Sequence, residues 1–76
     1  MFHFLTNLPF QACMHRIYDV ADLQAAFEEF AEAAWGDDLQ PAVAVWNDNF
    51  LVGQVLPVYN PATGEYEPRL YAIPPP

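Results

Sequence analysis

One uninterrupted helical segment, residues 20–35, constrains the fold of this chain more than any other feature. It contains no glycine or proline, and seven of its residues are Ala or Leu, the residue types with the highest helix propensity. Asp19 precedes the segment and is predicted as its N-cap, which puts Asp22 at position N3 in the first turn. Gly36 follows the segment and is predicted to end the helix in a left-handed conformation.

The predicted helix is amphipathic. At about 100° per residue, its apolar side chains fall on one side and its acids on the other. The apolar side consists of Val20, Leu23, Phe27, Phe30, Ala31, Ala34 and Trp35. The opposite side holds Asp22, Glu29 and Glu32, with Glu28 on the flank. We therefore expect the helix to pack on the rest of the protein along one face.

The segments on either side of the helix have strand patterns. We predict strands over residues 13–18, 42–46, 50–59 and 66–73, separated in the second half by Asn47-Asp48-Asn49 and by residues 60–64. Both separators are rich in turn-forming residues. Gly53 is expected at a bulge and Pro57 at an edge or a strand end. Residues 1–10 are interpreted as a short strand or an extended arm, and residues 74–76 as a short polyproline tail.

This order of elements predicts an α+β fold, with a small antiparallel β-sheet of three to four strands and one amphipathic helix packed on one face. With 76 residues, the chain is expected to form a single domain over residues 1–76. Residues 1–12 are then an N-terminal arm or an edge strand.

Charge restricts the partners of the chain. The chain contains ten Asp and Glu residues but only two basic residues, Arg16 and Arg69, and no lysine. Its formal net charge is therefore −8. Such a charge repels nucleic-acid phosphates and anionic membranes and favours a basic partner, although acidity also serves solubility alone. No apolar run approaches the ~20 residues of a membrane span. Cys13 is the single cysteine, so no internal disulfide is expected, and a reducing cytoplasm is the expected location.

Catalytic and metal-binding motifs are sparse. Serine and lysine are absent, which excludes a serine triad, a Schiff-base lysine and a phosphate loop of the GxxxxGK[ST] type. Cys13 and His15 form the one candidate pair of nucleophile and base. With His3 they would make three possible metal ligands, but their spacing lacks the paired pattern of zinc sites. We expect no catalytic residues, no cofactor and no metal.

The concentration of acids around the helix is the main functional signal. Seven of the ten acids lie within residues 19–38, with no basic residue among them. Glu28 and Glu32 repel each other at i,i+4, and a partner rich in Arg and Lys would offset that repulsion. The predicted partner-binding residues are Asp22, Glu28, Glu29, Glu32, Asp37 and Asp38. The alternative is a solvated acidic face without a partner.

Aromatic residues are a second signal. Strand alternation predicts that about half of them face solvent if only one sheet face is covered, where Tyr and Trp are typical interface anchors. The set is Phe2, Phe4, Phe10, Trp46, Phe50, Tyr59, Tyr66 and Tyr71. Aromatic residues also build small cores and cross-strand pairs.

Residues 19–30, Asp37-Asp38 and the stretch Ala42-Val43-Ala44-Val45-Trp46 carry a resemblance at the level of a class. An acidic helix in a tiny α+β domain, followed by an aliphatic strand ending in Trp, resembles the inhibitors made by phages and mobile elements, such as anti-CRISPR proteins and antirestriction DNA mimics. The resemblance implies that acids stand in for phosphates on a basic surface of a CRISPR effector, nuclease or restriction enzyme. It also implies a stoichiometric mechanism without catalytic residues.

Three hypotheses follow. The first is a non-catalytic inhibitor that blocks a basic nucleic-acid-binding surface without binding nucleic acid or membrane itself. The second is a structural, assembly or homodimerisation module that uses the aromatic sheet face. The third is a small enzyme or metal protein built on Cys13, His15 and His3.

Overall fold

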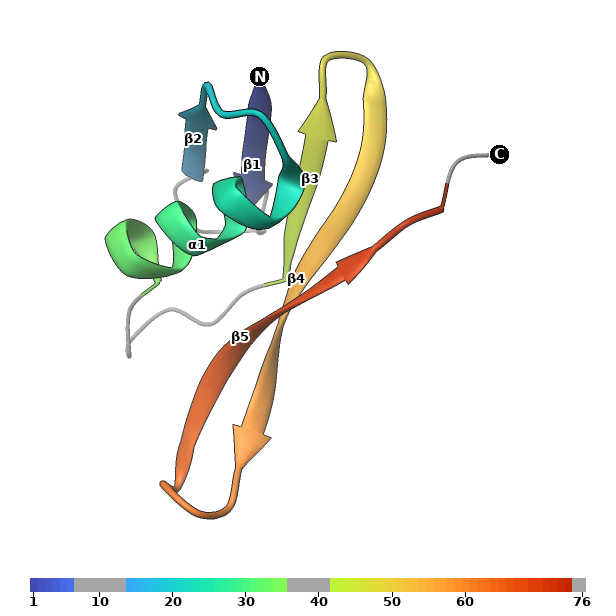
Figure 1. Ribbon diagram of the computed structural model, residues 1–76. Helices are drawn as coiled ribbons and strands as arrows, with labels where there is room; N and C mark the ends of the chain where they lie inside the picture. Colours follow the sequence, from blue (N-terminus) through green and yellow to red (C-terminus); the bar gives the residue numbers. More distant parts are fainter. Residues whose placement is uncertain (7–13, 36–41, 75–76) are drawn as a thin grey trace.

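The structure is a computed structural model, and it describes residues 1–6, 14–35 and 42–74. Its elements follow one another along the chain as a strand pair, a helix and three further strands (Figure 1). They are β1 (Phe2–Thr6), β2 (Met14–Tyr18), α1 (Leu23–Ala34), β3 (Val43–Asn47), β4 (Phe50–Asn60) and β5 (Glu65–Ala72). The predicted α+β fold is confirmed, but the sheet has five strands instead of three to four.

The strands form one antiparallel sheet in the order β2-β1-β3-β4-β5. β1 lies between β2 and β3 and is therefore an inner strand, not an arm or an edge strand. The side chains of Phe2, Phe4 and Thr6 alternate with half-buried ones and are themselves buried. In an inner position, both edges of β1 are hydrogen-bonded to neighbouring strands, and its row of apolar side chains is buried under the helix.

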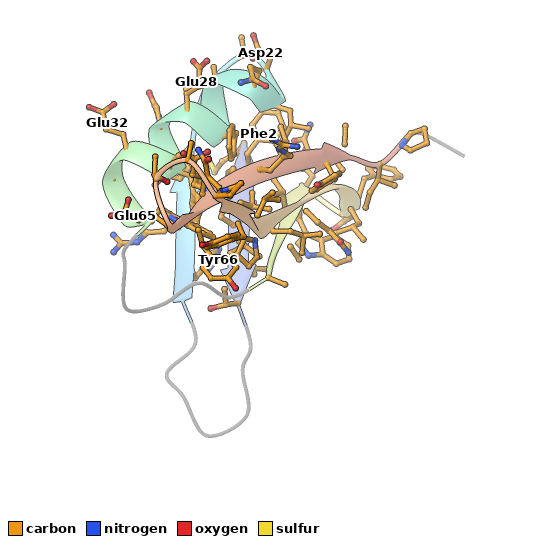
Figure 2. The ribbon with its side chains drawn as sticks, turned by 90° about the horizontal axis from the view of Figure 1, so that it is seen from below. Phe2, Asp22, Glu28, Glu32, Glu65 and Tyr66 are labelled. Carbon is orange, nitrogen blue, oxygen red and sulfur yellow. The ribbon has the colours of Figure 1, made fainter. Side chains whose placement is uncertain are left out.

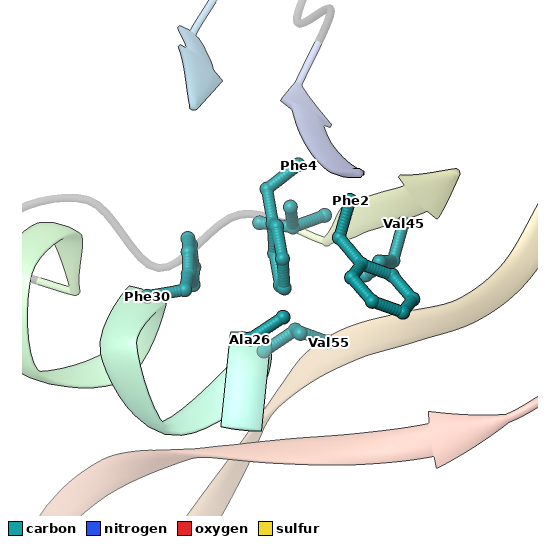
Figure 3. Packing of buried hydrophobic residues seen from close by; sticks show 7 residues of the cluster. Phe2, Phe4, Ala26, Phe30, Val45 and Val55 are labelled. Atoms are coloured by element: carbon teal, nitrogen blue, oxygen red, sulfur yellow. The ribbon is translucent and has the colours of Figure 1, made fainter. Parts of the chain in front are cut away.

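The helix α1 covers one face of the sheet, and the core lies between them. Phe4 and Phe30 stack with their ring centroids 4.6 Å apart and nearly parallel, so the strand and the helix meet through two aromatic rings (Figure 3). Tyr18 on β2 packs edge-on against Phe4 at 5.5 Å. The buried hydrophobic residues are Phe2, Phe4, Ala26, Phe30, Val43, Val45 and Val55.

The helix begins three residues later than predicted. Asp22, not Asp19, is the N-cap, and its Oδ1 accepts a hydrogen bond of 2.8 Å from the backbone N–H of Ala25. This bond satisfies one of the free donors of the first turn, and it places Asp22 just outside the helix. The prediction of Asp22 at N3 is therefore wrong. Gly36, the predicted stop, lies outside the described residues.

The predicted irregularity at Gly53 is confirmed as a β-bulge. Val45 pairs with Gly53 but Trp46 pairs with Leu51, so the register between β3 and β4 shifts at this point. Gly53 is buried, and a Cβ there would lie 3.2 Å from the backbone oxygen of Tyr71. Glycine thus permits a close approach of two strands beneath the helix.

The hairpin of β4 and β5 extends past the rest of the sheet (Figure 1). β3 pairs with β4 only as far as Val55, whereas β4 continues to Asn60 with β5 as its partner. Pro57 lies in this extension opposite Pro68. Because β3 begins only at Val43, opposite Val55, it does not extend to Pro57. The missing N–H of Pro57 therefore interrupts no bond to that strand, in keeping with the predicted edge position.

No helix in the described part of the chain is long and apolar enough to cross a membrane.

Candidate partner-binding surface

The outer side of α1 carries three glutamates that we call the acidic helix face: Glu28, Glu29 and Glu32. All three are exposed, and Figure 2 shows Glu28 and Glu32 pointing away from the sheet. Their exposure follows from the helical period, because Ala26 and Phe30 occupy the opposite, buried side. The structure therefore brings these three predicted residues together on one surface.

Three other predicted binding residues differ from this group. Asp22 is exposed beside the helix N-terminus (Figure 2), but its Oδ1 is engaged as the N-cap. Its carboxylate thus has a structural role that the glutamates lack. Asp37 and Asp38 lie outside the described residues.

No cation on α1 itself neutralises the acidic helix face. α1 contains no basic residue, and the amide of Gln24 donates a hydrogen bond of 3.4 Å to Glu28 Oε1. Glu28 and Glu32 are one turn apart and repel each other. Glu32 also lies in the last turn, where the helix dipole disfavours negative charge. The local fold therefore bears an electrostatic cost that a cationic partner would relieve.

The predicted cysteine–histidine set is only partly described. His3 Nδ1 and His15 Nε2 are 3.0 Å apart, with ring centroids at 5.2 Å, so one imidazole donates a hydrogen bond to the other. Cys13 lies outside the described residues. Within the ranges that the structure describes, no group of three or more His, Cys, Asp or Glu side chains is arranged to hold a metal ion.

The aromatic residues divide between the core and the surface. Phe2 and Phe4 are buried, whereas Tyr59 and Tyr66 form a cross-strand pair in the hairpin extension, with ring centroids 5.4 Å apart. These two tyrosines are 54% and 49% exposed. Phe10 lies outside the described residues. The sequence predicted exposed aromatics in general and the two strands of this hairpin, but it did not predict that the hairpin extends past β3.

A second surface lies on the side of the sheet away from α1, and we call it the open sheet face. Because paired residues share a face in an antiparallel sheet, the registers and the alternating burial define its members. They are His3, Leu5, His15, Ile17, Ala44, Trp46, Leu51, Gln54, Leu56, Val58, Asn60, Glu65, Glu67, Arg69 and Tyr71. Sequence reasoning missed this grouping because only the pairing of distant strands brings these residues together.

The centre of the open sheet face is hollowed. An open hollow of about 350 Å³ is lined by Leu5, Ala42, Val43, Ala44, Trp46 and Gln54. Its walls are mostly apolar, so it suits an apolar side chain from another molecule better than a charged ligand.

No family model, curated protein or solved structure matches this chain. The functional argument therefore rests on the surfaces themselves.

Proposed function

We propose that the chain is a non-catalytic inhibitor of the anti-CRISPR or antirestriction type. In this proposal the acidic helix face binds a basic, nucleic-acid-binding surface of a CRISPR or nuclease complex in the cytoplasm, and its carboxylates take the place of phosphates. The observation that carries the proposal is the exposure of Glu28, Glu29 and Glu32 on one helix face with no cation on that helix.

The spacing of the glutamates supports this reading. Glu28 and Glu32 are separated by about 6 Å along the helix axis, since each residue rises 1.5 Å. Two arginines or lysines that normally hold successive phosphates of one strand can therefore each meet one carboxylate. Glu29, on the neighbouring side of the same turn, adds a third charge to the same face.

Electrostatic steering supports an inhibitory role for a chain this small. The net charge of −8 accelerates encounter with a basic groove and repels nucleic acid that competes for it. Each exposed pair adds only ~0.2–1 kcal/mol, so affinity on this surface requires several pairs together.

The test is a plasmid-protection assay in bacteria that carry a defined CRISPR or restriction system. Expression of the wild-type chain should restore plasmid transformation in at least one system. A variant with Glu28→Gln, Glu29→Gln and Glu32→Gln should lose that protection, because three pairs worth ~0.2–1 kcal/mol each correspond to an affinity loss of about three- to hundredfold.

A matched control removes three negative charges elsewhere, with Asp48→Asn, Glu65→Gln and Glu67→Gln, all at exposed positions. This control should keep protection. Equal loss in both variants would show that net charge, and not the acidic helix face, is responsible. Full protection by the helix variant would refute the proposal.

The purified complex should also dissociate as salt increases, because exposed charges are screened beyond ~10 Å at 0.1 M salt. A complex that survives high salt would point to an apolar interface instead.

A further inference from the structure

We propose that His3 and His15 form a surface site for a divalent transition-metal ion of the Ni(II) or Cu(II) kind, with water completing the coordination. The two ligand atoms are the facing ring nitrogens, His3 Nδ1 and His15 Nε2, which lie 3.0 Å apart. This inference goes beyond the proposed function, because it uses the N-terminal strand pair β1 and β2 (Figure 1) and none of the glutamates of the acidic helix face.

The antiparallel pairing of β1 and β2 brings the two histidines together. His3 pairs with Ile17 and His15 pairs with Leu5, so the histidines are diagonal neighbours on one face of the sheet. Diagonal neighbours lie about 7–8 Å apart, a distance that two long side chains can bridge. Along the chain the histidines are 12 positions apart, which is why their spacing did not resemble a metal motif and no metal was expected from the sequence.

The distance between the facing nitrogens fits a chelate. They are 3.0 Å apart, so a metal about 2.0–2.1 Å from each nitrogen would hold them at an angle of roughly 90–100°. That angle matches two adjacent positions of a square-planar or tetragonal complex, the geometry typical of Cu(II) and Ni(II). A tetrahedral ion such as Zn(II) needs about 3.3–3.4 Å between two nitrogens, so the pair suits it less well.

The hydrogen bond between the two rings is compatible with metal binding. In the metal-free protein one facing nitrogen carries a proton and the other accepts it. A neutral imidazole carries its single proton on either ring nitrogen. With His3 protonated at Nε2 and His15 at Nδ1, both facing lone pairs are free. The metal then occupies the place of the shared proton, and no proton has to leave either ring.

The surroundings of the histidine pair admit a hydrated cation. His15 is exposed and His3 is half-buried, so water can reach the remaining coordination positions. The strand partners of the two histidines are Ile17, Leu5 and Trp46, and none of them carries a charge that would repel a cation. The net charge of −8 also raises the concentration of cations near the protein.

A second way to bind the same ions starts from the N-terminal amine. An amine and a histidine in third position can hold Ni(II) or Cu(II) together with the backbone nitrogens between them. In the structure the amine of Met1 instead donates a hydrogen bond of 3.4 Å to Asn47 Oδ1, and Phe2 and His3 pair with both β2 and β3. The amine mode would take these residues out of the sheet, and it does not need His15, so a substitution there separates the two modes.

The experiment is a titration of the full chain with nickel chloride, because Ni(II) does not oxidise the thiol of Cys13. Isothermal titration calorimetry measures stoichiometry and affinity, and tryptophan fluorescence reports on Trp46, the strand partner of His3. The wild type should bind a single ion with a dissociation constant below about 1 mM, and its fluorescence should be quenched. Its Tm should rise with Ni(II) concentration, because the ion binds the folded state.

Two variants, His3→Gln and His15→Gln, each leave one imidazole. Because the chelate is lost, the dissociation constant should rise by at least about tenfold in each variant, and the quenching and the gain in Tm should disappear. Two matched controls keep the histidines: Cys13→Ala, and the variant with three glutamines on the acidic helix face. Both controls should bind Ni(II) like the wild type. Far-UV circular dichroism establishes that each variant is folded.

A wild-type chain that binds no Ni(II) at about 1 mM would overturn the proposal. So would a folded His15→Gln variant whose dissociation constant rises by less than about tenfold, since the amine of Met1 and His3 would then hold the ion. Loss of binding in either control would place the ion on Cys13 or on the carboxylates and would equally overturn it. The proposed inhibitor function fails separately, because it depends on the acidic helix face and needs no metal.

Discussion

Replacing Glu32 with lysine should stabilise the folded protein, because that position combines two unfavourable electrostatic terms. Glu32 repels Glu28 at i,i+4 and Glu29 at i,i+3, and all three side chains are exposed. It also lies in the last turn of α1, next to the negative end of the helix dipole. Lysine reverses both terms.

The magnitude can be worked from these contacts. Removal of the repulsion from Glu28 and formation of a Glu28–Lys pair in the favourable order each contribute about 0.2–0.5 kcal/mol. Favourable placement near the helix C-terminus adds about 0.3–1 kcal/mol. The sum is about 1 kcal/mol or slightly more, a sizeable part of the ~4–11 kcal/mol expected for a domain of this length.

The assay is thermal unfolding followed by circular dichroism at low and high salt. For a domain of 60–100 residues, about 1 kcal/mol raises Tm by roughly 4–8 °C. The gain should largely disappear at about 1 M salt, where the screening length is ~3 Å. Glu32→Gln, the neutral control, should give about half the gain.

The result that would refute this reasoning is an unchanged or lower Tm for Glu32→Lys at low salt. A gain that persists at high salt would equally refute it, because the cause would then be helix propensity or packing and not charge. If the gain is observed while plasmid protection is lost, the acidic helix face sacrifices stability for binding.

Three further substitutions test the fold. Phe30→Ala removes the ring stacked on Phe4 and should cost about 3–5 kcal/mol, measured by urea unfolding; a loss below about 1 kcal/mol would mean that the stack is not part of the core. Asp22→Ala removes the N-cap bond and should lower stability by about 1 kcal/mol, while Asp22→Asn, which retains an acceptor, should lose much less. Gly53→Ala places a Cβ 3.2 Å from the backbone oxygen of Tyr71 and should cost about 1–3 kcal/mol by overpacking; a stabilised variant in thermal unfolding would contradict the close approach of β4 and β5.

The sequence predicted the elements of the C-terminal half closely, because their ends are marked by local chemistry. Asn60 accepts backbone hydrogen bonds from Thr63 and Gly64 and, through its side chain, from Ala62. Gly64 has a positive φ of 74°. These preferences act over a few residues and are visible in the sequence.

The helix start and the sheet order were predicted less well. Asp19 and Asp22 are both competent N-caps, and the choice depends on where the chain must turn after β2, which the sequence alone does not specify. The inner position of β1 depends on its pairing with β3, a long-range contact with no local signal. For the same reason the sequence predicted the glutamates of the acidic helix face one by one, whereas it predicted an exposed sheet face without its members.

The inner position of β1 has a consequence for how the chain reaches this fold. Phe4 pairs with Arg16 on one side and with Val45 on the other, so β1 joins a near neighbour in the chain to a distant one. Closing the long loop to β3 carries an entropic penalty before any core contact repays it. The hairpins β1–β2 and β4–β5 form locally and can precede it. We therefore expect the docking of β1 against β3 beneath α1 to limit the folding rate, with Phe4 and Val45 in the nucleus where these two strands meet.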